Sequence, residues 1–218
     1  MTASTRPTVT RQHLWRTDIT GLRALAVLPV LLFHAFPEYL PGGFFGVDIF
    51  FVISGYLISG IIFRGLLSGT FSYAEFYAKR IRRILPNLIL VLAFCFVMGW
   101  FWISAREYAT LGQHIYASAG FYQNFRLMGE AGYFDAASET KPLLHLWSLA
   151  IEEQFYIVFP IICAAVWKFT RSAKAIFVAI FCITVGSLVA CLAVVDPAVD
   201  FYFPLTRFWE FFFWGGVL

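Results

Sequence analysis

The sequence predicts an all-α, multi-span integral membrane protein, and two observations support this fold class. Hydrophobic residues make up 60% of the 218-residue chain and charged residues 13%, whereas charged residues are about 25% of an ordinary soluble domain. The apolar runs are long and continuous, as in residues 85–103 and 175–195. Strands of a membrane β-barrel would alternate apolar and polar residues over about ten positions, so helices are predicted.

Six membrane spans are expected, following a basic cytoplasmic tail over residues 1–17. The spans are predicted at residues 19–36, 44–67, 86–104, 143–167, 175–195 and 201–218, with Pro86 opening the third. Residues 71–85 alternate aromatic and basic side chains, which predicts an amphipathic helix at the membrane interface. Residues 108–125 are expected to form a half-buried helix that does not cross the membrane, and residues 126–142 a loop.

The distribution of basic residues predicts an amino terminus in the cytoplasm. With that orientation 12 of the 16 Lys and Arg residues lie inside and 4 outside, as the positive-inside rule requires. The inner set is Arg6, Arg11, Arg16, Arg23, Arg64, Lys79, Arg80, Arg82, Arg83, Lys168, Arg171 and Lys174; the outer set is Arg106, Arg126, Lys141 and Arg207. Because the basic residues sit at membrane boundaries, no nucleic-acid partner is expected.

The chain stops within an apolar run, residues 211–218, that has no flanking charge. We therefore expect residues 18–218 to be the amino-terminal part of a longer membrane domain.

The segment His145–Tyr156 places ionisable side chains next to a membrane-spanning run. Such residues are costly in a membrane and usually face a functional cavity. At about 100° per residue, His145 and Glu152 differ by roughly 20° on a helix, and Ser148 lies between them. Glu153 lies about 100° away from Glu152, so Glu152 is the better candidate for a site and Glu153 is expected to pair elsewhere.

Arg23 and His34 form a second candidate pair in the first span. Eleven residues separate them, which places them on one helix face, about 16 Å apart along the axis. A neutral imidazole near a water boundary is the usual general base. The alternative is structural: Arg23 would reach lipid phosphates and His34 would cap the helix end.

The run Lys79–Arg83 is most simply an anchor on anionic lipid, and composition favours that reading. The functional alternative is a docking site for a phosphorylated cytosolic donor. In that case Arg80 and Arg83, at i and i+3, would present two guanidinium groups to one anion.

Other polar and small residues in the spans have simpler explanations. Asp48, near the outer boundary, needs a partner, and Arg207 and Glu210 most simply satisfy one another. Gly55 and Gly60 are expected to allow close helix packing. The four cysteines all fall in apolar runs, and their spacing suggests neither a metal site nor a disulfide framework.

Four ordered motifs resemble those of the acyltransferase-3 family. They are Arg23-X10-His34, the segment Gly42–Tyr56, the segment Phe76–Pro86 and the segment His145–Tyr156. Members of this family are bacterial multi-span enzymes that O-acylate, usually O-acetylate, cell-surface carbohydrate. The chain looks most like the branch fused to an extracytoplasmic SGNH-type domain. The resemblance implies about ten spans, so six spans alone are expected to be inactive.

This resemblance implies transfer of an acyl group, expected to be acetyl, from cytoplasmic acyl-CoA to carbohydrate hydroxyls at the outer face of the bacterial inner membrane. Lipopolysaccharide O-antigen or another polysaccharide would be the acceptor, and no bound cofactor is expected. His34 is the expected base, with Glu152 or Asp48 orienting it and His145 the second choice. Arg23, Arg80 and Arg83 would hold the donor phosphates. Ser148 is a weaker option as a nucleophile, and direct transfer and a covalent intermediate both stay open.

Two other functional classes compete with the enzyme hypothesis. A transporter or flippase would use intramembrane His and Glu side chains for substrate or protons, and it predicts an inverted repeat that the sequence does not display. An inactive scaffold would not need the His and Arg residues.

Overall fold

The computed structural model describes residues 17–36, 38–130 and 141–212. The predicted basic tail thus lies outside the described residues, apart from Thr17. Every regular element within the described ranges is helical, which confirms the all-α fold class. Five of these helices are long and apolar enough to cross a membrane. They are α1 (Thr17–Ala35), α2 (Gly46–Leu67), α3 (Tyr73–Trp102), α6 (Leu146–Thr170) and α7 (Ala173–Ala193).

The chain divides into two compact units, residues 1–47 and 48–218. In the first unit, α1 packs against the 3-10 turn η1 (Gly43–Phe45). Gly43 is buried there, and a Cβ atom at this position would lie 2.2 Å from the carbonyl oxygen of Pro29. The glycine therefore lets the chain return closely along α1 after the turn.

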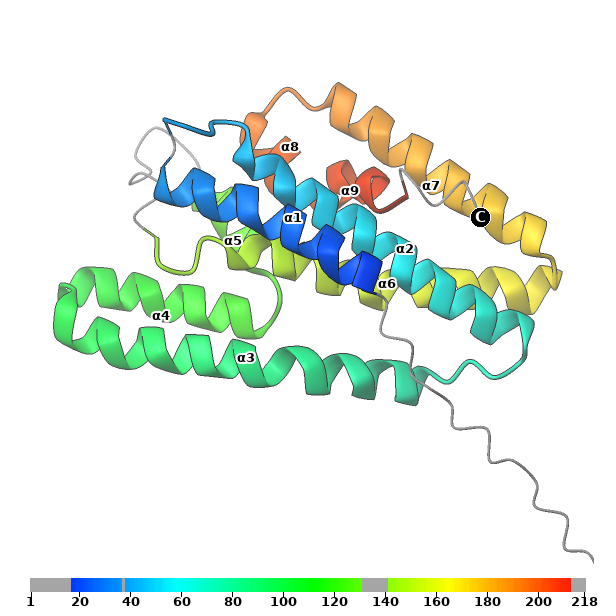
Figure 1. Ribbon diagram of the computed structural model, residues 1–218, viewed down its shortest axis with the longest axis horizontal. Helices are drawn as coiled ribbons and strands as arrows, with labels where there is room; N and C mark the ends of the chain where they lie inside the picture. Colours follow the sequence, from blue (N-terminus) through cyan, green and yellow to red (C-terminus); the bar gives the residue numbers. More distant parts are fainter. Residues whose placement is uncertain (1–16, 37, 131–140, 213–218) are drawn as a thin grey trace, which may run out of the picture. The chain divides into compact units, whose positions relative to one another are not determined.

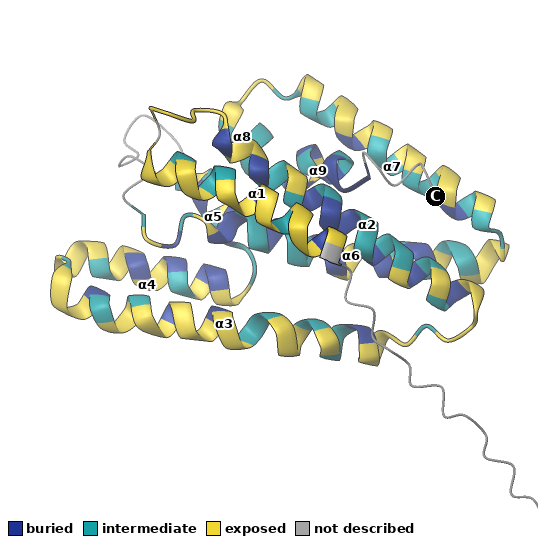
Figure 2. Ribbon diagram, in the orientation of Figure 1, coloured by how far each residue is buried: buried dark blue, intermediate teal, exposed yellow. Residues whose placement is uncertain are grey.

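The second unit contains the long helices α2, α3, α6 and α7, with shorter helical elements between and after them along the chain (Figure 1). Figure 1 shows α3 beside α4 (Ala105–Ala119), and α6 followed by α7. The shorter elements are α5 (Gln123–Glu130), α8 (Pro197–Tyr202), α9 (Pro204–Arg207) and η3 (Phe208–Phe212). Most residues of α3 and α7 are exposed or half-buried (Figure 2). This is expected where a helix is apolar all round and faces lipid, as in α7 and in residues 86–102 of α3.

Stacked aromatic rings form the core of the second unit. Phe155 of α6 stacks on Phe211 of η3, with ring centroids 4.1 Å apart, and Phe51 of α2 stacks on the same ring at 4.7 Å. Phe159 continues the stack along α6, 4.9 Å from Phe155. These rings are at most 2% exposed, so α2, α6 and η3 share one tightly packed contact.

Side-chain caps explain where several helices begin. Ser72 accepts a hydrogen bond from the Glu75 backbone N–H at the start of α3. Ser104 and Glu107 form a capping box at the start of α4, a pattern that satisfies two backbone donors at once. Asp196 accepts from two backbone N–H groups and is followed by Pro197 at the first position of α8.

The third span differs from the prediction because α3 is continuous through Pro86. The predicted interfacial helix over residues 71–85 and the span after it are therefore one 30-residue helix. Pro86 cannot bond the carbonyl four residues earlier, that of Arg82. Membrane helices tolerate such a gap because neighbouring groups and water satisfy the freed carbonyl.

The segment between the third and fourth spans is more helical than predicted. Residues 108–125 are divided between α4 and α5 by a turn at Gly120–Tyr122, and Arg126–Glu130 belong to α5 rather than to a loop. The short α4 is not among the helices long enough to span, in agreement with the prediction. Residues 131–140 of the predicted loop lie outside the described ranges.

The expected last span, residues 201–218, is not one continuous helix over its described part. Phe203 adopts an extended conformation (φ −82°, ψ 127°) between α8 and α9. The following Pro204 disfavours helical geometry at the residue before it, so the chain breaks into α8, α9 and η3. Residues 213–218 of this expected span are outside the description.

Candidate active site

His34 and Arg23 both lie on α1, in the first unit. His34 is exposed in the last turn, and its Nδ1 lies 2.8 Å from the backbone oxygen of Val30. Because a carbonyl can only accept, Nδ1 carries the proton in this arrangement, and the basic lone pair is on Nε2. Arg23 is half-buried on the same helix. The contact with Val30 thus uses Nδ1 and leaves Nε2 as the ring nitrogen that can act as a base.

Glu152 is the centre of a hydrogen-bond network between α2 and α6. Its Oε1 accepts hydrogen bonds from the hydroxyl of Ser54 and from that of Tyr156, one turn further along α6. Ser54 and Tyr156 are buried and Glu152 is half-buried. The prediction that Glu152 faces a polar site is consistent with this contact.

Glu153 has different neighbours from Glu152. It interacts electrostatically with Arg80 and Arg83 as well as with Glu152. Its Oε1 is buried and has no hydrogen-bond partner among the described residues. The two adjacent glutamates therefore have different neighbours: Glu152 bonds hydroxyl groups, and Glu153 lies near the arginines. Their separation around the helix implies this difference.

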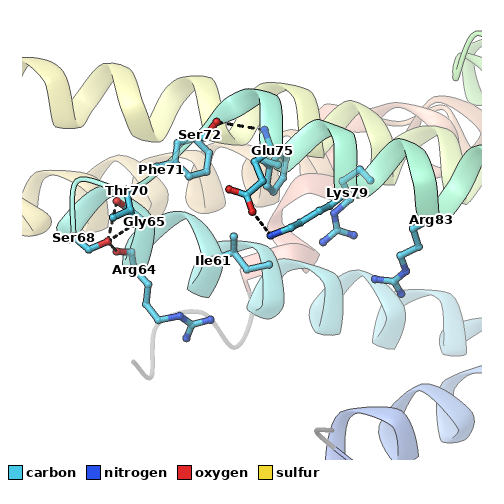
Figure 3. Close-up of a pocket in the computed structure, with 12 residues that line it drawn as sticks. Ile61, Arg64, Gly65, Ser68, Thr70, Phe71, Ser72, Glu75, Lys79 and Arg83 are labelled. Carbon is cyan, nitrogen blue, oxygen red and sulfur yellow. Dashed lines mark hydrogen bonds and ion pairs between the residues drawn. The ribbon is translucent and has the colours of Figure 1, made fainter. Parts of the chain in front are cut away.

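A cleft of about 420 Å³ lies between the end of α2 and the start of α3. Its described lining includes four basic side chains, those of Arg64, Lys79, Arg80 and Arg83, and one carboxylate, that of Glu75. Figure 3 shows Arg64 on α2 and Lys79 and Arg83 on α3 around the cleft. Lys79 Nζ is bonded to Glu75 Oε1 at 2.6 Å. The cleft thus carries excess positive charge, suited to an anion with several phosphate groups.

Arg80 connects this cleft to the Glu152 network. Its guanidinium carbon lies 4.5 Å from the centre of the Tyr156 ring and 5.8 Å from that of Phe76. The same Tyr156 donates its hydroxyl hydrogen to Glu152. The cleft, the arginine, the tyrosine and the carboxylate are therefore in sequential contact.

Asp48 is paired with Arg207, which is held at the junction of α2, α6 and α9. Arg207 bonds Asp48, and its Nε lies 3.0 Å from Oε1 of Glu210. The guanidinium also lies within 6 Å of three aromatic rings, those of Phe51, Trp147 and Phe201. The predicted pairing of Arg207 with Glu210 is confirmed, and Asp48 joins it as a second carboxylate.

His145 is the N-cap of α6, and its backbone has helical dihedral angles (φ −58°, ψ −16°). It is the residue before α6, and it is exposed. Ser148 Oγ donates to the backbone oxygen of His145 at 3.1 Å. Ser148 thus bonds the backbone of its own helix start, whereas Glu152 accepts from the side chains of Ser54 and Tyr156.

A second polar cluster joins α4, α5 and the segment before α6. His114 is 3% exposed, its Nδ1 accepts from the Gln123 amide at 2.7 Å, and its Nε2 lies 3.2 Å from Oε2 of Glu130. Glu130 also bonds Arg126 at 2.7 Å and Lys141 at 3.0 Å. Burial lowers the pKa of His114 below its usual value, and this outweighs the attraction of Glu130. His114 is therefore a neutral structural residue near neutral pH.

Sequence reasoning missed Arg64, Ser54 and Tyr156 as members of these sites. Tyr156 could have been found, because it follows Glu152 by four residues and so shares its helix face. Arg64 lies in the predicted inner set, but its place beside Arg80 depends on how α2 meets α3. Ser54 is 98 residues from Glu152, and no local pattern joins residues so far apart.

Comparisons with known proteins agree on one family. A family model described as "Acyltransferase domain" matches residues 16–218. A "Putative peptidoglycan O-acetyltransferase" of Bacillus subtilis is 35% identical over 213 residues, which are 92% of this chain and 32% of that protein. A "Putative membrane-bound transacylase" of Komagataeibacter xylinus is 33% identical over 196 residues, 90% of this chain and 49% of that protein.

A third relative, a "Putative O-acetyltransferase" of Staphylococcus aureus, is 40% identical over 148 residues, 66% of this chain and 24% of that protein. The chain thus spans about half or less of the length of these three curated relatives. No solved structure matches the chain.

Proposed function

Because the chain belongs to the acyltransferase-3 family, we propose that this protein transfers an acyl group, expected to be acetyl, to hydroxyl groups of a cell-envelope carbohydrate. The relatives named as O-acetyltransferases support acetyl as the group transferred. The Bacillus relative is named for peptidoglycan. For this protein we propose a glycan acceptor at the outer face of the inner membrane, either lipopolysaccharide O-antigen or another polysaccharide.

The basic cleft is the observation that carries the donor assignment. Acyl-CoA presents phosphate groups at one end and the thioester at the other, so a site for it needs cations beside a route to the reacting groups. The cleft supplies Arg64, Lys79, Arg80 and Arg83. These residues fall in the set that the positive-inside rule places in the cytoplasm, where acyl-CoA is made.

The proposed chemistry moves one proton and one acyl group. His34 Nε2 takes the proton of the acceptor hydroxyl as the oxygen attacks the thioester carbonyl, which gives a tetrahedral oxyanion. Collapse of the oxyanion breaks the carbon–sulfur bond, and the leaving thiolate takes the proton back from the imidazolium. The new ester and free coenzyme A are then the products. Arg23 is proposed to assist Arg80 and Arg83 at the phosphates, and Glu152 or Asp48 to orient the base.

The test uses the full-length protein in lipid nanodiscs with radiolabelled acetyl-CoA and an isolated glycan acceptor. Arg80→Ala and Arg83→Ala are expected to weaken donor binding by about tenfold or more each, since hydrogen bonds to charged groups contribute about 1.5–3 kcal/mol. Arg82→Ala is the matched control, because Arg82 belongs to the same basic run but is not in the described lining of the cleft.

The proposal is supported if the wild-type protein transfers label to the glycan, if Arg80→Ala and Arg83→Ala bind the donor more weakly, and if Arg82→Ala binds it as the wild type does. Equal losses in all three variants would instead favour a general attraction to anionic lipid. Absence of transfer by the wild-type protein to any envelope glycan would contradict the function itself.

A further inference from the structure

We propose that Tyr156 is a positioning residue whose ring holds the guanidinium group of Arg80, leaving the N–H donors of Arg80 available to the phosphates of the donor. This inference rests on the proposed function and deepens it. It assigns a role to a buried tyrosine that touches neither donor nor acceptor and acts through Arg80.

The guanidinium group of Arg80 lies over the ring of Tyr156. The guanidinium carbon is 4.5 Å from the ring centre, well within the distance of about 6 Å at which a cation is attracted to an aromatic face. The Phe76 ring lies at 5.8 Å, so two aromatic side chains flank the same cation. Neither contact is a hydrogen bond to a nitrogen or oxygen acceptor, so neither supplies an acceptor that would compete with an anion.

The donors of Arg80 are left unused by the described protein. Among the described residues no hydrogen bond and no ion pair within 4 Å occupies the Arg80 guanidinium. Its carboxylate neighbour Glu153 acts on it through the electrostatic field only. An arginine held over an aromatic ring, beside a cleft that it lines, has N–H donors available for an anion.

Tyr156 is in turn held firmly in place. Its side chain is 2% exposed, and its hydroxyl donates to Glu152, which is also bonded by Ser54 of α2. At the backbone, the hydroxyl of Tyr77 on α3 lies 3.5 Å from the carbonyl oxygen of Tyr156 and 3.3 Å from that of Ile157. The ring that supports Arg80 is thereby tied to α2, α3 and α6.

Two substitutions at Tyr156 distinguish the role of its ring from the role of its hydroxyl group. Tyr156→Phe keeps the aromatic face under Arg80 and removes the bond to Glu152. Tyr156→Leu removes both. If the ring face positions Arg80, the phenylalanine variant binds donor nearly normally and the leucine variant does not.

The measurement is the dissociation constant of coenzyme A for the full-length protein in nanodiscs. Tyr156→Leu is expected to raise this constant by about 2- to 30-fold, the range that corresponds to the strength of cation–π contacts. Tyr156→Phe is expected to stay within about twofold of the wild type, because the ring remains. Phe159→Leu is the matched control: Phe159 is also 2% exposed on α6 and stacks on Phe155, away from the cleft lining.

A double-mutant comparison tests whether Tyr156 acts through Arg80. In an Arg80→Ala background, Tyr156→Leu is expected to add little further loss, since the residue that it supports is gone. Additive losses, or a Phe159→Leu effect as large as that of Tyr156→Leu, would overturn the positioning role. A Tyr156→Phe variant that binds coenzyme A as weakly as Arg80→Ala would also overturn the positioning role. Tyr156→Phe changes the volume of the core very little, so its result does not depend on repacking.

The outcomes also separate this inference from the proposed function. No binding of coenzyme A by the wild-type protein would overturn both. Normal binding by the wild type and by Tyr156→Leu would overturn the role of Tyr156 and leave the donor assignment intact.

Discussion

At the scale of single residues, the arrangement of hydrogen bonds decides which groups can react and which are structural. His34 donates Nδ1–H to its own helix and keeps Nε2 as the acceptor nitrogen. His114 has both ring nitrogens turned toward protein groups in a buried cluster. The same side chain is thus a candidate base in one place and a packing residue in the other.

His34→Ala in the full-length protein is expected to lower acetyl transfer by about 10²–10⁴-fold, the usual contribution of a general base. The amount of membrane-inserted protein is expected to stay the same, because His34 is exposed. Arg23→Ala is expected to weaken use of the donor more than use of the acceptor. Activity of His34→Ala within a few-fold of the parent, together with a large loss in His145→Ala, would move the role of base to His145.

His114 makes a prediction about stability and pH. Burial lowers its pKa in the folded protein below 6.5, so the unfolded chain takes up a proton at a higher pH than the folded one. The stability contributed by neutral His114 is therefore complete above about pH 6.5 and is lost as the pH falls from there through the lower folded pKa. Glu130, Lys141 and Arg126 surround this group and set how far the pKa moves.

Thermal unfolding of the purified protein at about pH 7.5 and about pH 5, on either side of the ordinary histidine pKa, measures this effect. The unfolding temperature of the wild type is expected to fall more between the two conditions than that of His114→Gln. A parallel fall in both proteins would show that other groups cause the acid sensitivity.

At the scale of the elements, close approach between helices is set by a few small residues. A Cβ atom on Gly55 of α2 would lie 1.8 Å from the backbone oxygen of Phe211 in η3. A Cβ atom on Gly60, further along α2, would have as its nearest neighbour the flexible end of the Arg64 side chain at 3.4 Å. The packing role predicted for both glycines is consistent with the structure at Gly55, whereas at Gly60 the three nearest atoms all belong to the Arg64 side chain.

Gly55→Ala is therefore expected to destabilise the second unit by about 1–3 kcal/mol, the usual cost of overpacking, because a backbone carbonyl cannot move aside. Gly60→Ala, with the same chemical change on the same helix, is expected to have little effect. Thermal unfolding in detergent compares the two variants. Equal unfolding temperatures would contradict the close approach of α2 and η3.

At the scale of the whole molecule, charge and hydrophobic length together predict how the chain crosses the membrane. The five long apolar helices support a multi-pass membrane protein. The basic cleft joins the end of α2 to the start of α3, a region that the positive-inside rule places in the cytoplasm. The polar cluster around His114 would then lie toward the outer face.

The topology is tested by labelling single cysteines from the periplasmic side, after replacement of Cys95, Cys163, Cys182 and Cys191. Asp135→Cys is expected to react and Arg171→Cys to be protected, because the two positions lie in segments of opposite predicted sidedness. Labelling of both positions, or of position 171 alone, would reject the predicted orientation.

The sequence by itself determined the helical membrane fold and most of the spans, because long apolar runs can satisfy their backbone in lipid only as helices. It also placed Arg23 with His34 on one helix and Arg80 with Arg83 on another, since helical spacing is a local property. Its errors fell at Pro86, where the helix continues, and at Pro204, where it breaks.

Only the tertiary structure decided which polar groups meet. Asp48 bonds Arg207 across 159 residues, and Glu152 bonds Ser54 across 98. Arg80 rests on Tyr156, and Arg64 joins Arg80 at one cleft. Each pair joins different helices, and its distance depends on which faces those helices turn toward each other. A helix that is hydrophobic all round has no distinct apolar face in its sequence, so the sequence does not show which side meets a neighbour. Packing at places such as Gly55 and Phe211 selects the partners instead.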